Sequence, residues 1–231
     1  MSSEPMILAV ETATLAGSIA IARGAQIICG LNGEPNVSHS NTLLADLDRL
    51  LDQTGVELSD VDLLAVAAGP GSFTGLRIGI ATIKALAATL DRPCAAIPTL
   101  QSVALGGGVS DVTVALLPAG RGEVFAQSFA VSNDGAVTPL DEAVHIAPRK
   151  MIEKYGSHER VLWCGEGAIA QRELIESAAA SKEWRIAAPA ENLAQQVAAL
   201  AFGRFLQDQL VAPDALQAIY VRPSDAELKV S

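Results

Sequence analysis

Half of the 231 residues are apolar and only 18% are charged, a balance typical of a folded globular chain and not of a disordered one. The formal net charge is −10, and phosphate backbones, whose contacts dominate nucleic-acid affinity, repel such a chain. The composition therefore argues against disorder and against strong direct binding of nucleic acid, and the length allows one large or two small domains.

Three widely spaced cysteines, Cys29, Cys94 and Cys164, indicate reduced thiols and no disulfide framework. The first residues, Met1–Pro5, carry no positive charge, which argues against a secretion signal. No apolar run approaches the roughly 20 residues of a membrane span. We therefore expect a cytoplasmic protein that does not enter a membrane.

The first half of the chain alternates between strands and helices. Three strands in a row, joined by turns, predict an antiparallel meander: Met6–Val10, Gly17–Ala22 and Gln26–Leu31. The spacing of five leucines predicts a helix over Ser38–Gln53, capped by Ser38 or Ser40. A strand buried on both faces, a helix and a last strand follow, at Leu63–Ala68, Leu76–Leu90 and Cys94–Ile97.

The second half repeats this order in reduced form. We expect a hairpin, a short helix, a strand, two further helices and a final strand, over Val112–Leu117, Glu123–Val131, Pro148–Tyr155, Val161–Cys164, Ile169–Ala180, Glu191–Leu210 and Leu216–Val221. The triplet Gly106–Gly108 is the best linker signal, and it predicts domains over residues 1–105 and 106–231. The final helix and strand are left free to pack on either domain.

A glycine-rich turn, Gly69–Gly79, joins the fourth strand to the next helix. Strand, turn and helix N-terminus together favour anions, because free N–H groups and the helix dipole point at one place. The turn lacks the Gly-Lys-Ser/Thr of a Walker A loop, and Pro70 and Thr74 stand where a nucleophile elbow needs glycines. Two interpretations stay open: a tight turn capped by Ser72 or Thr74, or a weak phosphate or nucleotide site made by Glu11, Thr12, Gly71, Ser72, Thr74 and Gly75.

The helix Leu76–Leu90 is apolar nearly all round, with only Arg77, Thr82, Lys84 and Thr89 polar. Such a helix is covered on several sides, either within its own chain or by another chain.

Five segments carry a resemblance to a known family: Ile7–Thr14, Gly17–Ala22, Gly69–Gly79, Arg121–Phe125 and Ala218–Ala226. In this order, and over essentially the whole chain, they resemble the TsaB (YeaZ) family of bacterial proteins needed for threonylcarbamoyladenosine modification of tRNA. The resemblance implies an α/β fold of the actin-type ATPase class (ASKHA, RNase H-like), with two related lobes that are each a mixed sheet with helices.

The resemblance also implies partners. A TsaB-like chain pairs through its first two helices with itself when alone, or with a TsaD-like transferase, and a TsaE-like ATPase joins the complex. The reaction served is transfer of threonylcarbamoyl to N6 of an adenosine in tRNA, which this chain would meet only indirectly. The expected interface residues are Leu43, Leu44, Leu47, Leu50, Leu51, Leu76, Ile80, Ile83 and Lys84.

The catalytic residues of TsaD-like enzymes are missing. Gln101 and Leu105 stand where that family has its metal-binding histidine pair, and leucine cannot coordinate a metal. Glu11 replaces the first-strand Asp, and Pro118 stands where relatives often have an acidic residue. The resemblance therefore implies a non-catalytic subunit with no metal and no tightly bound cofactor, with ATP or ADP held only within the complex.

An enzyme of the same fold is the alternative. An ATP- or phosphate-handling kinase or ATPase would use Glu11, Thr12, Ser72 and Thr74. A serine peptidase built on Ser72 with His145 or His158 is disfavoured, because nothing in the sequence places either histidine near that serine.

Overall fold

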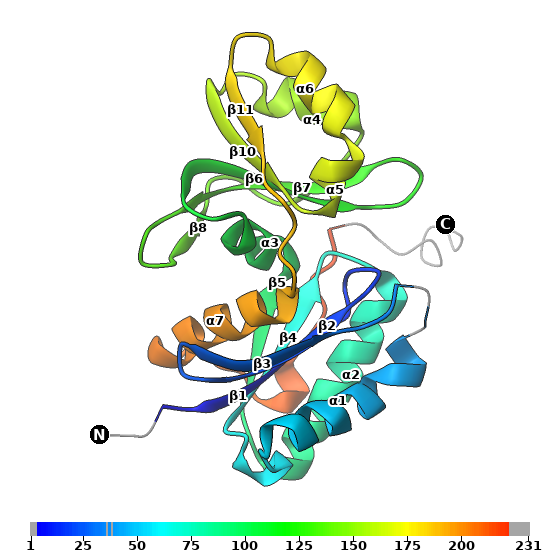
Figure 1. The fold of residues 1–231 in the computed structure, drawn as a ribbon, viewed down its shortest axis with the longest axis vertical. Coiled ribbons are helices and arrows are strands. Elements are labelled where there is room, and N and C mark those ends of the chain that lie inside the picture. Colours follow the sequence, from blue (N-terminus) through cyan, green and yellow to red (C-terminus); the bar gives the residue numbers. More distant parts are fainter. Residues whose placement is uncertain (1–3, 36, 38, 222–231) are drawn as a thin grey trace. The chain divides into compact units, whose positions relative to one another are not determined.

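The computed structural model describes residues 4–35, 37 and 39–221, and these form two compact units (Figure 1). The first unit contains the chain up to Thr99 and the segment Asn192–Ile219, and the second contains Leu100–Glu191. The chain thus leaves the first unit six residues before the boundary expected at 105/106. The glycines Gly106 and Gly107 are not a linker, because they end a helix, α3 (Thr99–Gly107).

The first unit is built on a five-stranded mixed sheet in the order β3-β2-β1-β4-β5. Its first three strands form the predicted antiparallel meander, and the next two run parallel to β1. Their bounds are Met6–Glu11 (β1), Ser18–Arg23 (β2), Gln26–Asn32 (β3), Leu63–Gly69 (β4) and Cys94–Pro98 (β5).

Alternate side chains of β1 pack into two different hydrophobic cores. Leu8 and Val10 belong to the cluster shared with α1 (His39–Thr54) and α2 (Phe73–Leu90). Ile7 and Ala9 belong to the cluster shared with α7 (Leu193–Leu206). Because side chains alternate along a strand, this division places α1 and α2 on one face of the sheet and α7 on the other. Ser38, expected to begin the first helix, lies outside the described residues.

The second unit has the same strand topology. Its sheet runs β11-β10-β6-β7-β8, with β9 also paired to β7. An antiparallel hairpin, β6–β7, is followed by strands parallel to β6, as in the first unit. The strands are Ser110–Pro118 (β6), Val124–Val131 (β7), Val137–Pro139 (β8), Val144–Ile146 (β9), Arg160–Cys164 (β10) and Glu183–Ile186 (β11). The predicted internal repeat is therefore present.

The core of the second unit is centred on Trp163, which is fully buried. Its ring meets Trp184 and Tyr155 edge-on, with centroids 5.1 and 6.1 Å apart. The helices α4 (Pro148–Tyr155), α5 (Glu166–Ala170) and α6 (Arg172–Ala179) all contribute to this core.

Two predictions of secondary structure are wrong. The expected helix Ile169–Ala180 is two helices, because the N–H of Gln171 bonds the carbonyls of Gly167 and Ile169 and ends α5 there. The expected strand Leu216–Val221 is absent. Cys94, at the edge of β5, instead forms an isolated bridge with Val211. The chain then passes through a short 3-10 helix, η2 (Pro213–Ala215), before Leu216 enters the core. A similar short 3-10 turn, η1 (Leu58–Asp60), precedes β4.

Candidate functional site

The glycine-rich turn leads directly from β4 into α2. Ser72 is the N-cap of α2, since its side chain accepts a 3.2 Å hydrogen bond from the N–H of Gly75. The side chains of Ser72 and Thr74 are exposed, whereas Gly75 is buried. The capping role expected of Ser72 is confirmed, and α2 begins three residues earlier than the apolar pattern predicts.

The glycines of this turn lie against the loop that joins β1 to β2. A Cβ atom built on Gly75 would stand 1.8 Å from the carbonyl oxygen of Thr12, and one on Gly71 would stand 2.6 Å from that of Ala13. On Gly79, a Cβ would stand 2.3 Å from the hydroxyl of Thr12. Real Cβ atoms do not approach so closely, so Gly71 and Gly75 accept only glycine without movement of the backbone, and a Cβ at Gly79 would displace the Thr12 hydroxyl.

Hydrogen bonds hold the same two segments together. The hydroxyl of Thr12 donates to the carbonyl of Gly75 at 2.7 Å, and the N–H of Ser72 donates to the carbonyl of Ala13 at 2.8 Å. The glycines thus have a packing role: they let α2 approach the β1–β2 loop at van der Waals distance. The phosphate site expected at these residues stays a prediction.

Glu11, at the end of β1, is 1% exposed. One carboxylate oxygen accepts the N–H of Thr14 at 2.7 Å, and the other accepts the hydroxyl of Thr14 at 2.7 Å and that of Ser18 at 3.5 Å. Burial raises the pKa of this carboxyl, an effect that the hydrogen bonds from Thr14 and Ala13 and the nearby His39 only partly oppose.

A cavity beside Glu11, lined also by His39 and Asp46, has a volume of only about 10 Å³, roughly the room of one water molecule. Both oxygens of Glu11 are already bonded within their own loop. This arrangement gives Glu11 little room to hold a magnesium–nucleotide complex.

Gln101, at one of the two positions where TsaD-like enzymes have metal-binding histidines, makes another contact. Gln101 lies on α3 and donates to the carbonyl of Val137 at 3.1 Å. His39 bonds the carbonyl of Thr14, and His145 lies 2.8 Å from a carboxylate oxygen of Glu123. Within residues 4–35, 37 and 39–221, no three His, Cys, Asp or Glu side chains come together as a metal site.

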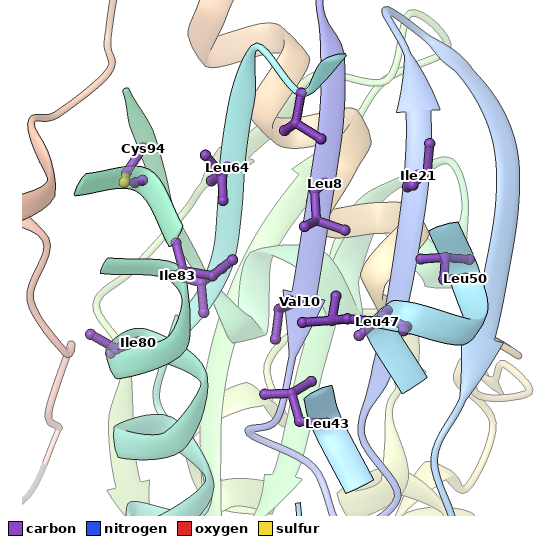
Figure 2. Close-up of a cluster of buried hydrophobic side chains, with 14 of the residues drawn as sticks. Leu8, Val10, Ile21, Leu43, Leu47, Leu50, Leu64, Ile80, Ile83 and Cys94 are labelled. Atoms are coloured by element: carbon purple, nitrogen blue, oxygen red, sulfur yellow. The ribbon is translucent and has the colours of Figure 1, made fainter. Parts of the chain in front are cut away.

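The expected interface residues divide into core and surface. Six of the nine are buried inside the first unit: Leu43, Leu47, Leu50, Leu76, Ile80 and Ile83. Figure 2 shows Leu43 and Leu47 from α1, and Ile80 and Ile83 from α2, gathered with Leu8 and Val10 of β1. The apolar stripe of each helix therefore packs against its own sheet, and the interface expected at these residues stays a prediction.

The outward faces of the two helices carry different residues. Leu44 is 65% exposed on α1, and Leu51 and Lys84 are half-buried. On α2, three exposed alanines follow at helical spacing: Ala81, Ala85 and Ala88. We call Leu44, Ala81, Ala85 and Ala88 the outer face of α1 and α2. Periodicity alone does not say which apolar stripe of α2 faces the sheet, so the sequence does not single out these alanines.

One flank of α2 is covered by the end of the same chain. Lys84 donates to the carbonyl of Asp214 at 3.3 Å, Leu216 enters the same core, and the N–H of Ile219 bonds the carbonyl of Ala68. This segment explains part of the apolar circumference of α2. By length and composition α2 could cross a membrane, yet it is packed on a sheet and only its outer side is open. Of the described residues, no other helix meets that test.

Comparison with known proteins agrees with this architecture. The family model for TsaD, tRNA N6-adenosine threonylcarbamoyltransferase, matches residues 35–204. The tRNA threonylcarbamoyladenosine biosynthesis protein TsaB of Escherichia coli is 29% identical over 231 residues, covering 97% of each chain. YeaZ from Pseudomonas aeruginosa superposes with a TM-score of 0.78 at 24% identity, covering 94% of this chain and 99% of that one.

A more distant structure shares the fold. The activator of 2-hydroxyisocaproyl-CoA dehydratase from Clostridium difficile, solved with bound ADPNP, has a TM-score of 0.51 at 10% identity, covering 93% of this chain and 99% of that one. The repeated mixed sheet and these neighbours define an α/β protein with the actin-type (ASKHA, RNase H-like) fold, as the family resemblance implies. Within that class, the chain belongs to the TsaB (YeaZ) family.

Proposed function

We propose that the chain is the non-catalytic subunit of the complex that makes threonylcarbamoyladenosine in tRNA, and that it binds and activates a TsaD-like transferase. The Escherichia coli relative that it matches over nearly its whole length is named for that biosynthesis. The observation that carries the proposal is the outer face of α1 and α2, where Leu44 and three alanines on a long apolar helix are open to solvent.

The physical basis is the removal of this apolar surface from water. Small side chains let a partner's helix approach the backbone of α2 closely, and Leu44 supplies a larger apolar contact at 65% exposure. A ligand that binds the competent state of the transferase more tightly than its other states increases the population of that state. Activation then needs no catalytic residue on this chain.

The chemistry of the remaining residues favours a binding role. Glu11 is engaged in its own loop, and Gln101 bonds a backbone carbonyl. The net charge of −10 favours contact with tRNA only through the transferase. Pairing with a second copy when the transferase is absent, and recruitment of a TsaE-like ATPase to the complex, belong to the same proposal.

The test uses size-exclusion chromatography with light scattering. The chain is mixed at micromolar concentration with the TsaD-like transferase of the same cell, and a one-to-one complex is expected. Leu44→Glu and Ala85→Glu should abolish it. Leu140→Glu, at a 50% exposed leucine in the second unit, is the matched control and should bind like the wild type.

Two results would overturn the proposal. One is the absence of a complex with the wild-type chain, and the other is an equal loss of binding in Leu140→Glu. Hydrolysis of MgATP by the lone chain, lost in Glu11→Gln, would favour the ATPase alternative.

A further inference from the structure

Glu11 is the centre of a small buried network in the β1–β2 loop. Its oxygens bond the N–H and the hydroxyl of Thr14 and, more weakly, the hydroxyl of Ser18. The Thr14 hydroxyl also accepts the N–H of Gly17 at 3.3 Å. One carboxyl group at the end of β1 therefore orders the six-residue loop that joins β1 to β2.

The network reaches the beginning of α1. The Nε2 atom of His39, the first residue of that helix, lies 3.1 Å from the carbonyl oxygen of Thr14. Since a carbonyl only accepts, Nε2 is the protonated nitrogen. The ring also lies close over Gly17, where a Cβ would stand 2.7 Å from the Cε1 atom of His39. The position of the first turn of α1 thus depends on where Thr14 and Gly17 are held.

The same loop contacts two other helices. The hydroxyl of Ser18 accepts the N–H of Ala194 in the first turn of α7 at 3.0 Å. Thr12, adjacent to Glu11, bonds Gly75 in the first turn of α2. The loop that Glu11 orders therefore contacts the first turns of three helices, α1 and α2 on one face of the sheet and α7 on the other.

We infer that Glu11 is a positioning residue for the outer face of α1 and α2: through Thr14, Gly17 and His39 it sets where α1 begins relative to α2. This inference rests on the proposed docking function. It gives the buried acid a role other than the weak phosphate or nucleotide binding considered from the sequence. An aspartate is shorter by one methylene, about 1.5 Å, and would not reach both groups of Thr14 from the same backbone.

The first arm of the test is hydrogen exchange on the full chain. In Glu11→Ala and in Thr14→Val, the amides of Thr14, Gly17 and Ala194 and those of residues 43–45 in α1 should exchange at least about tenfold faster, the loss expected for a hydrogen bond to a charged group. Amides of α4, in the second unit, should be unchanged. Glu11→Gln keeps an acceptor for the N–H of Thr14 and should restore most of the protection.

The second arm is affinity for the TsaD-like transferase. Glu11→Ala should weaken binding about tenfold, and Glu11→Gln should stay within about threefold of the wild type, on the same reasoning. The control is Ile175→Ala, which creates a cavity in the core of the second unit, where Ile175 is 1% exposed. It lowers stability without contact to the loop and should bind as the wild type does.

The inference is overturned if Thr14 and α1 keep wild-type exchange in both Glu11→Ala and Thr14→Val, or if Ile175→Ala loosens the same amides equally. A wild-type chain that does not bind the transferase refutes the proposed function, while the exchange arm still decides the role of Glu11 in placing α1. Thr14→Val preserves the side-chain shape, so the test survives if Glu11→Ala fails to fold.

Discussion

The hydroxyl of Thr12 donates a 2.7 Å hydrogen bond to the carbonyl of Gly75, 63 residues further along the chain. Thr12 is 1% exposed, and its backbone carbonyl lies over the same glycine. The bond therefore joins the β1–β2 loop to the first turn of α2 at a place with no room for a side chain. Three glycines of the most conspicuous sequence motif, Gly71, Gly75 and Gly79, lie where α2 and its preceding turn approach this loop.

Replacing Gly75 by alanine should destabilise the fold by about 3 kcal/mol, the upper end of the cost of overpacking, because the obstructing atom is a backbone carbonyl that cannot rotate away. The unfolding free energy from urea denaturation measures it. Gly203→Ala is the control: that glycine lies in α7 with nothing within 4 Å of the added Cβ, so alanine should be neutral or stabilising by up to about 1 kcal/mol. Equal effects at the two positions would contradict the packing role.

The pH dependence of stability should carry the signature of Glu11. Burial raises its pKa in the folded state above the ordinary value of 4.5. The folded chain then binds the proton of Glu11 more tightly than the unfolded chain does. The stabilisation of the fold by this proton is complete below the unfolded pKa and is lost as pH rises through the folded pKa. Between those values the difference in unfolding free energy between wild type and Glu11→Gln should change, by at most about 1.4 kcal/mol per pH unit for one proton. A pH-independent difference would show that the carboxyl does not titrate differently on folding.

Asp141 in the second unit should behave in the opposite way. Burial raises its pKa, but hydrogen bonds from Lys154, Ser128 and Tyr155 outweigh that effect and hold the pKa below its usual value. Its stabilisation is therefore present above the unfolded pKa of about 3.9 and is lost as pH falls through the folded pKa. Urea midpoints measured from pH 7 to pH 3 should decline less steeply in Asp141→Asn than in the wild type. If the urea midpoints of the two proteins fell equally steeply between pH 7 and pH 3, the result would argue against this network.

A second measurement isolates one bond of that network. Tyr155→Phe removes only the hydroxyl that donates to Asp141 at 3.0 Å and should cost about 1.5 kcal/mol at pH 7, the lower value for a hydrogen bond to a charged group, since two other donors remain. The unfolding free energy gives the value directly.

The sequence predicts strand order well, because local patterns carry it. The three-strand meander and the hairpin before Pro148 follow from alternation and turn residues, and both are present. Short edge strands are not predictable this way: β8, β9 and β11 have three or four residues each, too few for a period to show. Gly106 and Gly107 mislead for a different reason, since they end α3, where Gly107 packs closely against Cys164.

The candidate site was less predictable than the fold. Glu11 and Thr12 could be found because a polar pair ends a buried strand, but their partners Thr14, Ser18 and Gly75 are set by tertiary contacts. For the helices, the apolar pattern identified Leu43 and Ile80 without saying whether they face a sheet or a partner. Only the structure separates them from Leu44 and Ala85, because α2 has apolar residues on both its inner and outer sides.

The difference between buried and exposed positions on these helices leads to the last prediction, which concerns stability. Ile80 is 8% exposed within the core under α2, so Ile80→Glu buries a charge with no partner and should lower the unfolding free energy by about 3–5 kcal/mol. Leu44→Glu makes the same kind of change at a 65% exposed site and should alter stability by less than about 0.5 kcal/mol. Thermal unfolding followed by circular dichroism measures both. A stable Ile80→Glu chain would mean that this side chain faces outward and that the outer face of the helix has been placed on the wrong side. If Leu44→Glu unfolds the chain, its loss of transferase binding says nothing about docking, and Ala85→Glu then carries that test alone.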